Sequence, residues 1–493
     1  MSDNDNFKEG LKGTSIFGGV GIINIIISIV KSKLIAVLLG TEGMGLLGLF
    51  NSSTELISRL ASFGLRTSAV KDISEAYGTG DYNKIQRTIY VFKKLIILTG
   101  IIGTGAFAIM SPFLSYSSFG NYAYIAQFLL ISLFILLNQL LDGANVLMQG
   151  MRQLASLAKS NVYGNLLSLA FSFPFYYFGG LKGIAPSIVI GVLVHYLISL
   201  YYANKINIHK VKVSLREALI NGRGMLKMGF LIALQGILLS ASGYAIRAYI
   251  SYTSGVSDVG LYTAGFYIIN TYTSIVFSAM STEYYPRLAS IGNNQGICSA
   301  VNTQTNLTIT LLSPLIVCFI ILGNILILLL YTEEFLKITW MTNIAMIGMF
   351  LKGPAWCLGY VLLAKGESKL YFWSELVAII YTLVFNVVFL NVWGLTGMGF
   401  SFALSYGVYW IQIYLICKVK CGYSFDYSIL KQYITQIVIS LTGCIIVLLL
   451  VGFWKYMLGS ILIISSLYIS YRSLSENLNL EMVKGKLMKK FMK

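Results

Sequence analysis

Charged residues are scarce in this sequence. Of its 493 residues only 11% are Asp, Glu, Lys or Arg, whereas 56% are hydrophobic, and the mean hydropathy is +0.75. Soluble globular domains average about 25% charged residues, so this composition indicates an integral membrane protein. The first 13 residues are polar and the first apolar run is long enough to span a bilayer, so no cleavable signal peptide is expected.

Cysteine and histidine are also scarce. The six cysteines show neither a disulfide pattern nor zinc-ligand spacing. Of the two histidines, His195 lies in an apolar segment, where a hydrogen bond within the bundle is more common than a proton relay. Gly43 to Gly48 matches GxGxxG, but it follows a membrane segment and not a strand. With no catalytic set, Walker motif or metal cluster, we predict no enzyme, no metal, no cofactor and no direct use of ATP.

Apolar runs that are long enough to cross a membrane dominate the chain. We predict an all-α polytopic membrane protein with about fourteen transmembrane helices. The predicted segments are 14–39, 43–66, 88–111, 121–148, 154–178, 181–204, 225–251, 258–282, 303–330, 335–363, 369–391, 395–417, 432–453 and 456–472.

The positive charge is distributed unevenly along this pattern. With the N-terminus in the cytosol, 27 of the 36 Lys and Arg fall on the cytosolic side, 6 within helices and only 3 outside. The positive-inside rule therefore predicts a multi-pass membrane protein with both termini cytosolic. It also explains the net charge of +17 without a nucleic-acid partner.

An internal repeat divides the chain. The glycine motif of residues 39–46 recurs at 254–261, and that of 180–187 recurs at 394–401, at offsets of 215 and 214. Parallel repeats of this kind build two six-helix lobes around a central cavity, with the substrate site at their interface. The predicted domains are an N-terminal lobe 1–204, a cytosolic basic linker 205–224, a C-terminal lobe 225–417, a cytosolic connector 418–431, two additional helices within 432–472 and a basic cytosolic tail 473–493.

A polar stripe runs through the second predicted helix. It consists of Asn51, Glu55, Arg59, Ser62 and Arg66, at spacings of four, four, three and four residues. On a continuous helix these positions share one face. Ionised groups are costly in lipid, so the stripe predicts a protein-lined cavity. The alternative is a structural Glu55–Arg59 pair between helices, but the stripe extends beyond that pair to Arg66.

Similar stripes occur on other helices. Asp142 and Asn145 share a face of the fourth helix, and Asn270 holds the position in the eighth helix that Glu55 holds in the second. Lys31 in the first helix and Arg247 in the seventh are further candidates for an anion-binding cavity. Interhelical hydrogen bonds are the alternative role of such stripes.

The intramembrane charges are mostly positive. Lys31, Lys33, Arg59, Arg66, Arg247 and Lys352 oppose only Glu55, Asp142 and Glu375. A positively biased cavity suits a phosphate or carboxylate group. Asp142 and Glu55 are the candidates for ion or proton coupling; the alternative is that each neutralises a neighbouring cation.

Three stretches of the N-terminal half carry a family resemblance: GTSIFGG at 13–19, KLIAVLLGTEGMG at 33–45 and SFGLRTSAV at 62–70. The chain resembles bacterial O-antigen flippases of the Wzx type, within the multidrug/oligosaccharidyl-lipid/polysaccharide exporter superfamily. The resemblance implies a location in the bacterial cytoplasmic (inner) membrane and translocation of an undecaprenyl-pyrophosphate-linked oligosaccharide from its inner to its outer leaflet, by alternating access of the two lobes. It also implies cationic cavity residues that hold the pyrophosphate or acidic sugars, and Arg59, Arg66 and Arg247 are the positions that could play this part. Possible pathway partners are a polymerase and a chain-length protein.

Alternative functions remain open. A cation-coupled multidrug antiporter shares the architecture but favours an acidic cavity. The two extra helices are similar to those of lipid II-type flippases. A glycan polymerase or ligase needs catalytic outer loops, and the predicted outer connections are short, such as residues 251–258.

Overall fold

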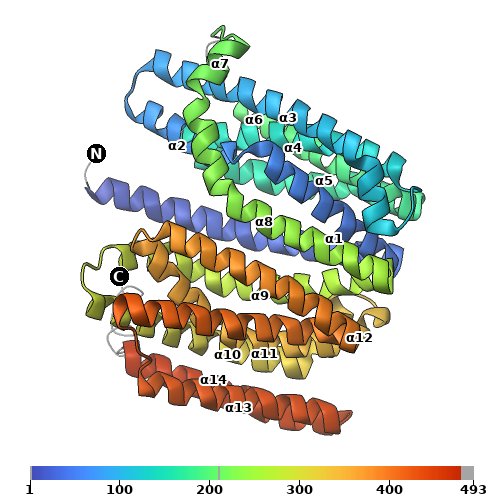
Figure 1. Cartoon of the computed structure of the whole chain (residues 1–493), viewed down its shortest axis with the longest axis vertical. Coiled ribbons are helices and arrows are strands. Elements are labelled where there is room, and N and C mark those ends of the chain that lie inside the picture. Colours follow the sequence, from blue (N-terminus) through green and yellow to red (C-terminus); the bar gives the residue numbers. More distant parts are fainter. Residues whose placement is uncertain (1–2, 209–210, 479–493) are drawn as a thin grey trace, which may run out of the picture. The chain divides into compact units, whose positions relative to one another are not determined.

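The computed structural model describes residues 3–208 and 211–478, and every regular element within these ranges is helical. The α-helices are α1 (Asp3–Ser62), α2 (Leu65–Gly78), α3 (Tyr82–Phe119), α4 (Ile125–Gly150), α5 (Leu154–Gly179), α6 (Ile184–Ala203), α7 (Leu215–Asn221), α8 (Arg223–Ser254), α9 (Val256–Ala289), α10 (Asn294–Leu330), α11 (Thr339–Ala364), α12 (Ser368–Cys421), α13 (Tyr427–Leu449) and α14 (Phe453–Leu478). The 3-10 turns η1 (Gly180–Gly183) and η2 (Glu333–Ile338) connect neighbouring helices (Figure 1).

In α1 and α12, residues with non-helical φ and ψ divide the helix into two segments. In α1 the kink is at Gly40, with φ 62° and ψ −159°; in α12 it is at Trp393 and Gly394, where Gly394 has φ 57° and ψ −144°. Glycine adopts such positive φ values easily because it has no Cβ. Since α2 and α7 are short, the described residues hold fourteen long helical segments. The predicted all-helical polytopic membrane fold is confirmed.

The backbone repeats itself at the offset of the sequence motifs. Shifting α4 (125–150) by 214 residues gives the bounds of α11 (339–364), and shifting Gly180 (φ 53°, ψ −137°) gives the kink at Gly394. Gly183 and Gly397 each pack against the carbonyl of a phenylalanine eight residues earlier. The two halves therefore share their turns as well as their helices.

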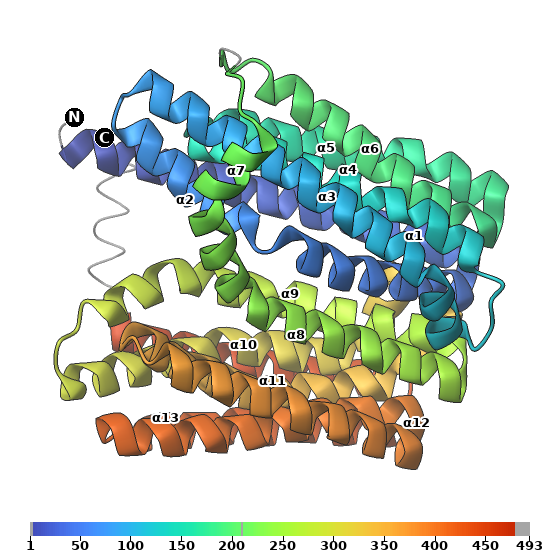
Figure 2. The same ribbon diagram turned by 45° about the horizontal axis from the view of Figure 1, so that its top comes forward.

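The chain forms two compact units, Met1–Thr263 and Ala264–Lys493. In the first unit α3 packs against α4, and α6 packs against both α4 and α5. Helix α8 packs against α1, α2 and α3 in the same unit, and Figure 2 shows its start beside α2 and α7. The boundary between the units, after Thr263, lies within α9. The two repeat lobes remain a prediction from the sequence.

A reciprocal glycine contact joins the repeated turns within the first unit. A Cβ on Gly45 would lie 1.9 Å from the carbonyl oxygen of Val256, and a Cβ on Gly260 would lie 1.9 Å from that of Thr41. Because Gly45 and Thr41 correspond to Gly260 and Val256 in the repeat, each turn makes the same contact with the other. Only glycine permits so close an approach of two backbones.

Helix α2 is anchored by an apolar cluster that fixes the start of the helix. Leu65, Ala69 and Ile73 lie on its buried face and pack in one cluster with side chains of α3 and α4. These positions recur every four residues, which is the spacing of one helix face. The packing therefore also fixes the position of Arg66, in the first turn.

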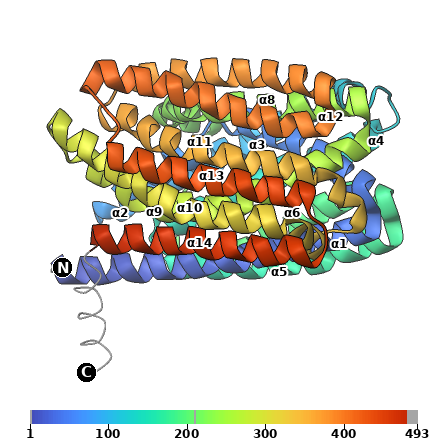
Figure 3. The ribbon, with the colours of Figure 1, turned by 90° about the horizontal axis from the view of Figure 1, so that it is seen from below.

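In the second unit α11 packs against α12, while α13 and α14 pack together against α10 (Figure 3). Gln436 of α13 donates to the Ser466 carbonyl of α14 at 3.3 Å and accepts from the Ser466 hydroxyl at 2.7 Å. These buried polar contacts hold α13 and α14 to each other.

Candidate functional site

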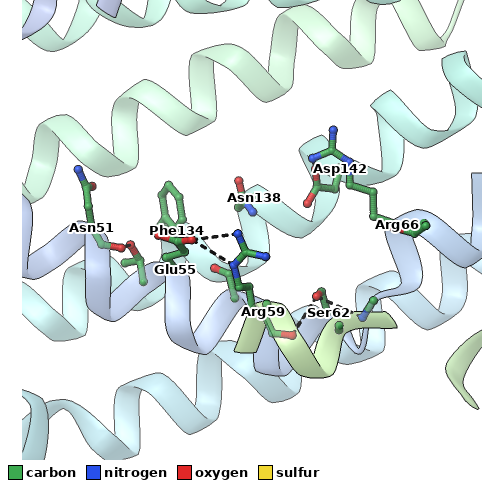
Figure 4. A pocket seen from close by; sticks show the side chains of 14 residues that line it. Asn51, Glu55, Arg59, Ser62, Arg66, Phe134, Asn138 and Asp142 are labelled. Carbon is green, nitrogen blue, oxygen red and sulfur yellow. Dashed lines mark hydrogen bonds and ion pairs between the residues drawn. The ribbon is translucent and has the colours of Figure 1, made fainter. Parts of the chain in front are cut away.

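The first unit contains a cavity of about 510 Å³, between the second segment of α1, the start of α2, α4 and α8 (Figure 4). All five residues of the predicted polar stripe line it. The lining residues are Asn51, Thr54, Glu55, Ser58, Arg59, Ser62, Gly64, Arg66, Thr67, Phe134, Asn138, Asp142, Ala233 and Gly236.

The stripe does not lie on one continuous helix, as the sequence predicted. Helix α1 ends at Ser62, and Phe63 (φ 44°) and Gly64 (φ 62°) adopt left-handed backbone conformations before α2 begins at Leu65. The backbone of Gly64 lies directly against Gly229 of α8, which leaves no room for a Cβ on either residue. Arg66 therefore reaches the cavity because the helix breaks, and not because of helical periodicity.

Glu55 and Arg59 form an ion pair one turn apart on α1. Arg59 donates from Nε and Nη2 to Glu55 Oε1 at 3.1 and 3.0 Å, and the Ser240 hydroxyl of α8 donates to the same oxygen at 3.2 Å. The Arg59 and Glu55 side chains are 47% and 55% exposed. Exposed pairs stabilise a fold by only about 0–1 kcal/mol. Opening this pair for a ligand therefore costs little.

Arg66 pairs with a carboxylate from a different helix. Its Nη1 lies 3.1 Å from Oδ1 of Asp142 in α4, and the Arg66 side chain is 60% exposed whereas that of Asp142 is 19% exposed. The carboxylate is mostly covered while the guanidinium remains open to the cavity (Figure 4). Both arginines of the stripe thus have an acidic partner.

The charges that line this cavity are balanced. Arg59 and Arg66 face Glu55 and Asp142, so the cationic excess of the whole membrane interior is not found here. The sequence tally could not separate groups that share a cavity from groups that lie elsewhere. Asn51 and Asn138 also line the cavity, and among the described residues neither amide has a hydrogen-bond partner.

The remaining predicted site residues do not line this cavity. Arg247 of α8 donates to the Gly243 carbonyl at 2.9 Å, and its guanidinium lies 5.4 Å from the centre of the Tyr262 ring. Asn145 is buried in α4, and its Oδ1 has no partner in the described part of the chain. Lys31 is partly exposed on the first segment of α1.

Asn270 belongs to the second unit. It is exposed on α9. Within the first unit the structure therefore brings together Glu55, Arg59, Arg66 and Asp142, whereas Lys31, Arg247 and Asn145 do not line their cavity.

The contribution of α8 to the cavity was not predicted. Gly236 accommodates the Arg59 guanidinium, whose Nη1 lies 2.6 Å from the place of a Cβ, and Ser240 binds Glu55 one turn later. The signal in the sequence is the spacing of Gly229, Gly236 and Gly243 at intervals of seven residues, which places them close to one face of a helix.

The chemistry that this arrangement supports is anion binding by exchange of partners. A guanidinium presents a planar fork of N–H donors that fits a phosphate or carboxylate in two parallel hydrogen bonds. Two such forks lie in one cavity, and each is occupied by a protein carboxylate that an incoming anion can replace. No group of three or more metal-ligating side chains occurs in residues 3–208 and 211–478.

A bundle of long apolar helices with ionised groups in a cavity is the architecture of a polytopic membrane transporter. The chain belongs to the polysaccharide biosynthesis protein family (Polysacc_synt), which matches residues 11–292. It is 21% identical over 398 residues to proteins named Lipid III flippase from Escherichia coli (strain K12) and Shigella flexneri, an alignment that covers 79% of this chain and 93% of each relative.

Solved structures show the same fold. The lipid II flippase MurJ in an inward closed conformation aligns with a TM-score of 0.69 at 13% identity, over 95% of this chain and 99% of MurJ. An inward-facing multidrug resistance MATE family transporter of the MOP superfamily aligns with a TM-score of 0.62 at 15% identity, over 81% of this chain and 94% of that one. The chain therefore shares the fold of MurJ and of the MATE family transporter, as the resemblance implied; the superfamily and the O-antigen type remain predictions.

Proposed function

We propose that this protein is a flippase that moves an undecaprenyl-pyrophosphate-linked oligosaccharide, an O-antigen repeat unit, across a bacterial inner membrane. The proposal rests on the two arginines that share one cavity, each held by a replaceable carboxylate. Membership of the polysaccharide biosynthesis family supports a glycan cargo, and the relatives named Lipid III flippase support a lipid-linked one.

Binding proceeds by exchange of ion-pair partners. The pyrophosphate binds the guanidinium groups of Arg59 and Arg66. This binding breaks the ion pairs of Arg59 with Glu55 and of Arg66 with Asp142. Each released carboxylate is then an uncompensated charge in a confined space, which is unfavourable unless it binds a proton or a cation. Glu55 and Asp142 are therefore our candidates for ion or proton coupling.

Four further residues are proposed to bind the cargo along the route. Arg247 supplies a third guanidinium, which is held by its cation–π contact with Tyr262 and by its hydrogen bond to the Gly243 carbonyl. Lys31, Asn145 and Asn270 are proposed contacts for anionic or hydroxyl groups.

Transport by alternating access of the two repeat lobes, with both termini in the cytosol, would carry the cargo from the inner to the outer leaflet. Membrane lipids surround the protein throughout. A polymerase and a chain-length protein of the same pathway are the proposed protein partners.

A cation-coupled multidrug antiporter is the second candidate. It is favoured by the equal number of acidic and basic groups in the cavity and by the fold shared with the MATE family transporter. A lipid II-type flippase is a variant of the first candidate, since MurJ has the same fold. The arginine forks favour an anionic cargo over a cationic drug.

Reconstitution into vesicles tests the proposal directly. The protein is incubated with undecaprenyl-pyrophosphate-linked oligosaccharide in one leaflet, with lipid II in a parallel sample and with an organic dye cation in a third. Appearance of the oligosaccharide in the opposite leaflet, above the rate in empty vesicles, is the expected result. Movement of lipid II alone would instead support the lipid II-type variant, and export of the dye alone would support the antiporter.

A further inference from the structure

The second unit contains its own cavity, of about 250 Å³, between α11 and the two segments of α12. Most of the residues that line it are aromatic, whereas most of those that line the first cavity have polar or charged side chains. Drug-sized ligands occupy about 300–1,000 Å³, so this smaller volume fits one ring-sized group. The aromatic lining residues are Trp356, Tyr360, Tyr371, Tyr406 and Tyr409.

The aromatic side chains form a pre-arranged wall. The Trp356 ring lies 4.9 Å from that of Tyr360 at 69°, and 5.9 Å from that of the buried Tyr284. Tyr284 donates to the Cys357 carbonyl at 2.9 Å, which holds this side of the wall in place. Trp and Tyr combine an apolar face with a polar edge. A pyranose ring is complementary, with C–H groups on its faces and hydroxyl groups around its rim.

Two charged side chains, those of Lys352 and Glu375, also line this cavity. The Lys352 ammonium lies 5.1 Å from the centre of the Tyr406 ring and 5.6 Å from that of Phe277. In the described ranges Lys352 has no carboxylate partner. Its ammonium group contacts ring faces, which stabilise a cation by about 0.5–2 kcal/mol, and the Glu375 carboxylate that also lines the cavity is bound by the Tyr409 hydroxyl. A charge-assisted contact with an anionic ligand group is stronger than a contact with a ring face.

The second charged group fixes the far side of the cavity. Glu375, on the first segment of α12, accepts a hydrogen bond from the Tyr409 hydroxyl on the second segment. Gly359 of α11 stands opposite that hydroxyl, with 3.4 Å between the place of a Cβ and the oxygen. The carboxylate and the hydroxyl therefore lie in the cavity as fixed partners for ligand hydroxyl groups.

The repeat shows that this cavity is placed like the first one. At the offset of 214, Lys352 and Trp356 hold the positions of Asn138 and Asp142, which line the cavity of the first unit. The same face of the repeated helix thus lines a cavity in both units. In the first unit that face carries an acid that holds an arginine, and in the second it carries an aromatic ring beside a lysine.

We propose that the cavity of the second unit binds one acidic sugar ring of the cargo, stacked on Trp356 with its carboxylate on Lys352. This inference rests on the proposed function, since it assigns the glycan to one unit and the pyrophosphate to the other. It defines the sugar class that the cavity accepts, a pyranose with a carboxylate substituent.

Equilibrium binding to the full-length protein in nanodiscs tests this assignment. The three probes are undecaprenyl pyrophosphate, an undecaprenyl-pyrophosphate-linked disaccharide that ends in glucuronic acid, and one that ends in glucose. Trp356→Ala should weaken both disaccharide probes by about tenfold or more and leave undecaprenyl pyrophosphate unchanged. Lys352→Gln should remove about a tenfold preference for the glucuronic acid probe, because a charge-assisted contact is lost.

Two controls keep the outcomes distinct. Trp373→Ala removes an exposed tryptophan of α12 that does not line the cavity, and it should bind all three probes like the wild type. Lys352→Gln leaves the Trp356 packing intact, so it remains informative if Trp356→Ala fails to fold. A folded Lys352→Gln variant that retains the wild-type preference overturns the sugar site alone. A wild-type protein that binds none of the three probes overturns the proposed function itself.

Discussion

Arg66 Nη1 lies 3.1 Å from Asp142 Oδ1, and this pair joins the break after α1 to the middle of α4. The two residues are 76 positions apart in the sequence, so no local pattern could pair them. Their exposure differs, at 60% for the Arg66 side chain and 19% for that of Asp142. The guanidinium is therefore the accessible member of the pair, which suits a group that exchanges its protein partner for an anionic cargo.

The first prediction concerns the two arginines. The double variant Arg59→Ala, Arg66→Ala should nearly abolish translocation, since each lost charge-assisted contact weakens binding by roughly ten- to a hundredfold. Arg59→Lys should retain part of the activity, because lysine keeps the charge but lacks the fork. Leaflet-resolved transport by the reconstituted variants measures both effects.

A matched control for this double variant lies in the same unit. Arg87 pairs with Glu217 at 2.7 Å outside the cavity, so Arg87→Ala removes an arginine–carboxylate pair without touching the proposed site. It should transport at the wild-type rate. Because Glu55 and Asp142 lose their partners in the double variant, its expression and melting temperature are measured first. Wild-type transport by a normally folded double variant would falsify the arginine site.

The second prediction concerns coupling. Asp142→Asn keeps the shape of the side chain but cannot exchange a proton or pair with a cation, so transport should lose its dependence on a proton or sodium gradient. Arg66 loses its protein partner in this variant, and cargo binding without a gradient should therefore tighten. Translocation of the cargo between leaflets is measured with and without a proton gradient, and with and without a sodium gradient. Unchanged gradient dependence would assign Asp142 a purely charge-neutralising role.

The third prediction concerns the break between α1 and α2. Gly64 has φ 62°, and a Cβ there would lie 2.0 Å from the Gly229 carbonyl oxygen. Gly64→Ala should therefore destabilise the protein through backbone strain of about 1–2 kcal/mol and a clash of about 1–3 kcal/mol. Gly80 provides the control, since its φ is 68° and nothing lies within 4 Å of its Cβ position. Melting temperatures of the two purified variants compare the effects, and equal losses would show that the Gly229 contact contributes nothing.

Much of this architecture could be predicted because membrane helices are long and the repeat is visible. The spans, the offset of 214 residues and the polar stripe of α1 all follow from local patterns. Helix α2 also has a local signal that lies mostly outside the predicted segments: Leu65, Ala69 and Ile73 recur at one-turn spacing. Helix α7 carried another, with Ser214 as its N-cap and Glu217 three residues later.

The candidate site could be predicted only in part. Glu55 and Arg59 pair within one helical turn, so their sequence spacing is sufficient. The Arg66–Asp142 pair, the Ser240 contact to Glu55 and the balance of charge in the cavity depend on which helices lie side by side. A single sequence gives the charges of each helix but not their neighbours, and it therefore indicated an excess of cations that this cavity does not have.

The last prediction concerns orientation in the membrane. Ser254, at the end of α8, should face the outside, whereas Ser214, before α7, should face the cytosol. Both residues are exposed, so a cysteine at either position is accessible to a reagent on its own side. The six native cysteines are first replaced to remove background labelling. In intact cells a membrane-impermeant maleimide should label Ser254→Cys but not Ser214→Cys, and Ser214→Cys should react only after the cells are opened. Equal labelling of both variants from outside would contradict the predicted topology. It would also contradict the cytosolic placement of both termini, because that placement follows from the same fourteen spans and the same 27-to-3 division of basic residues.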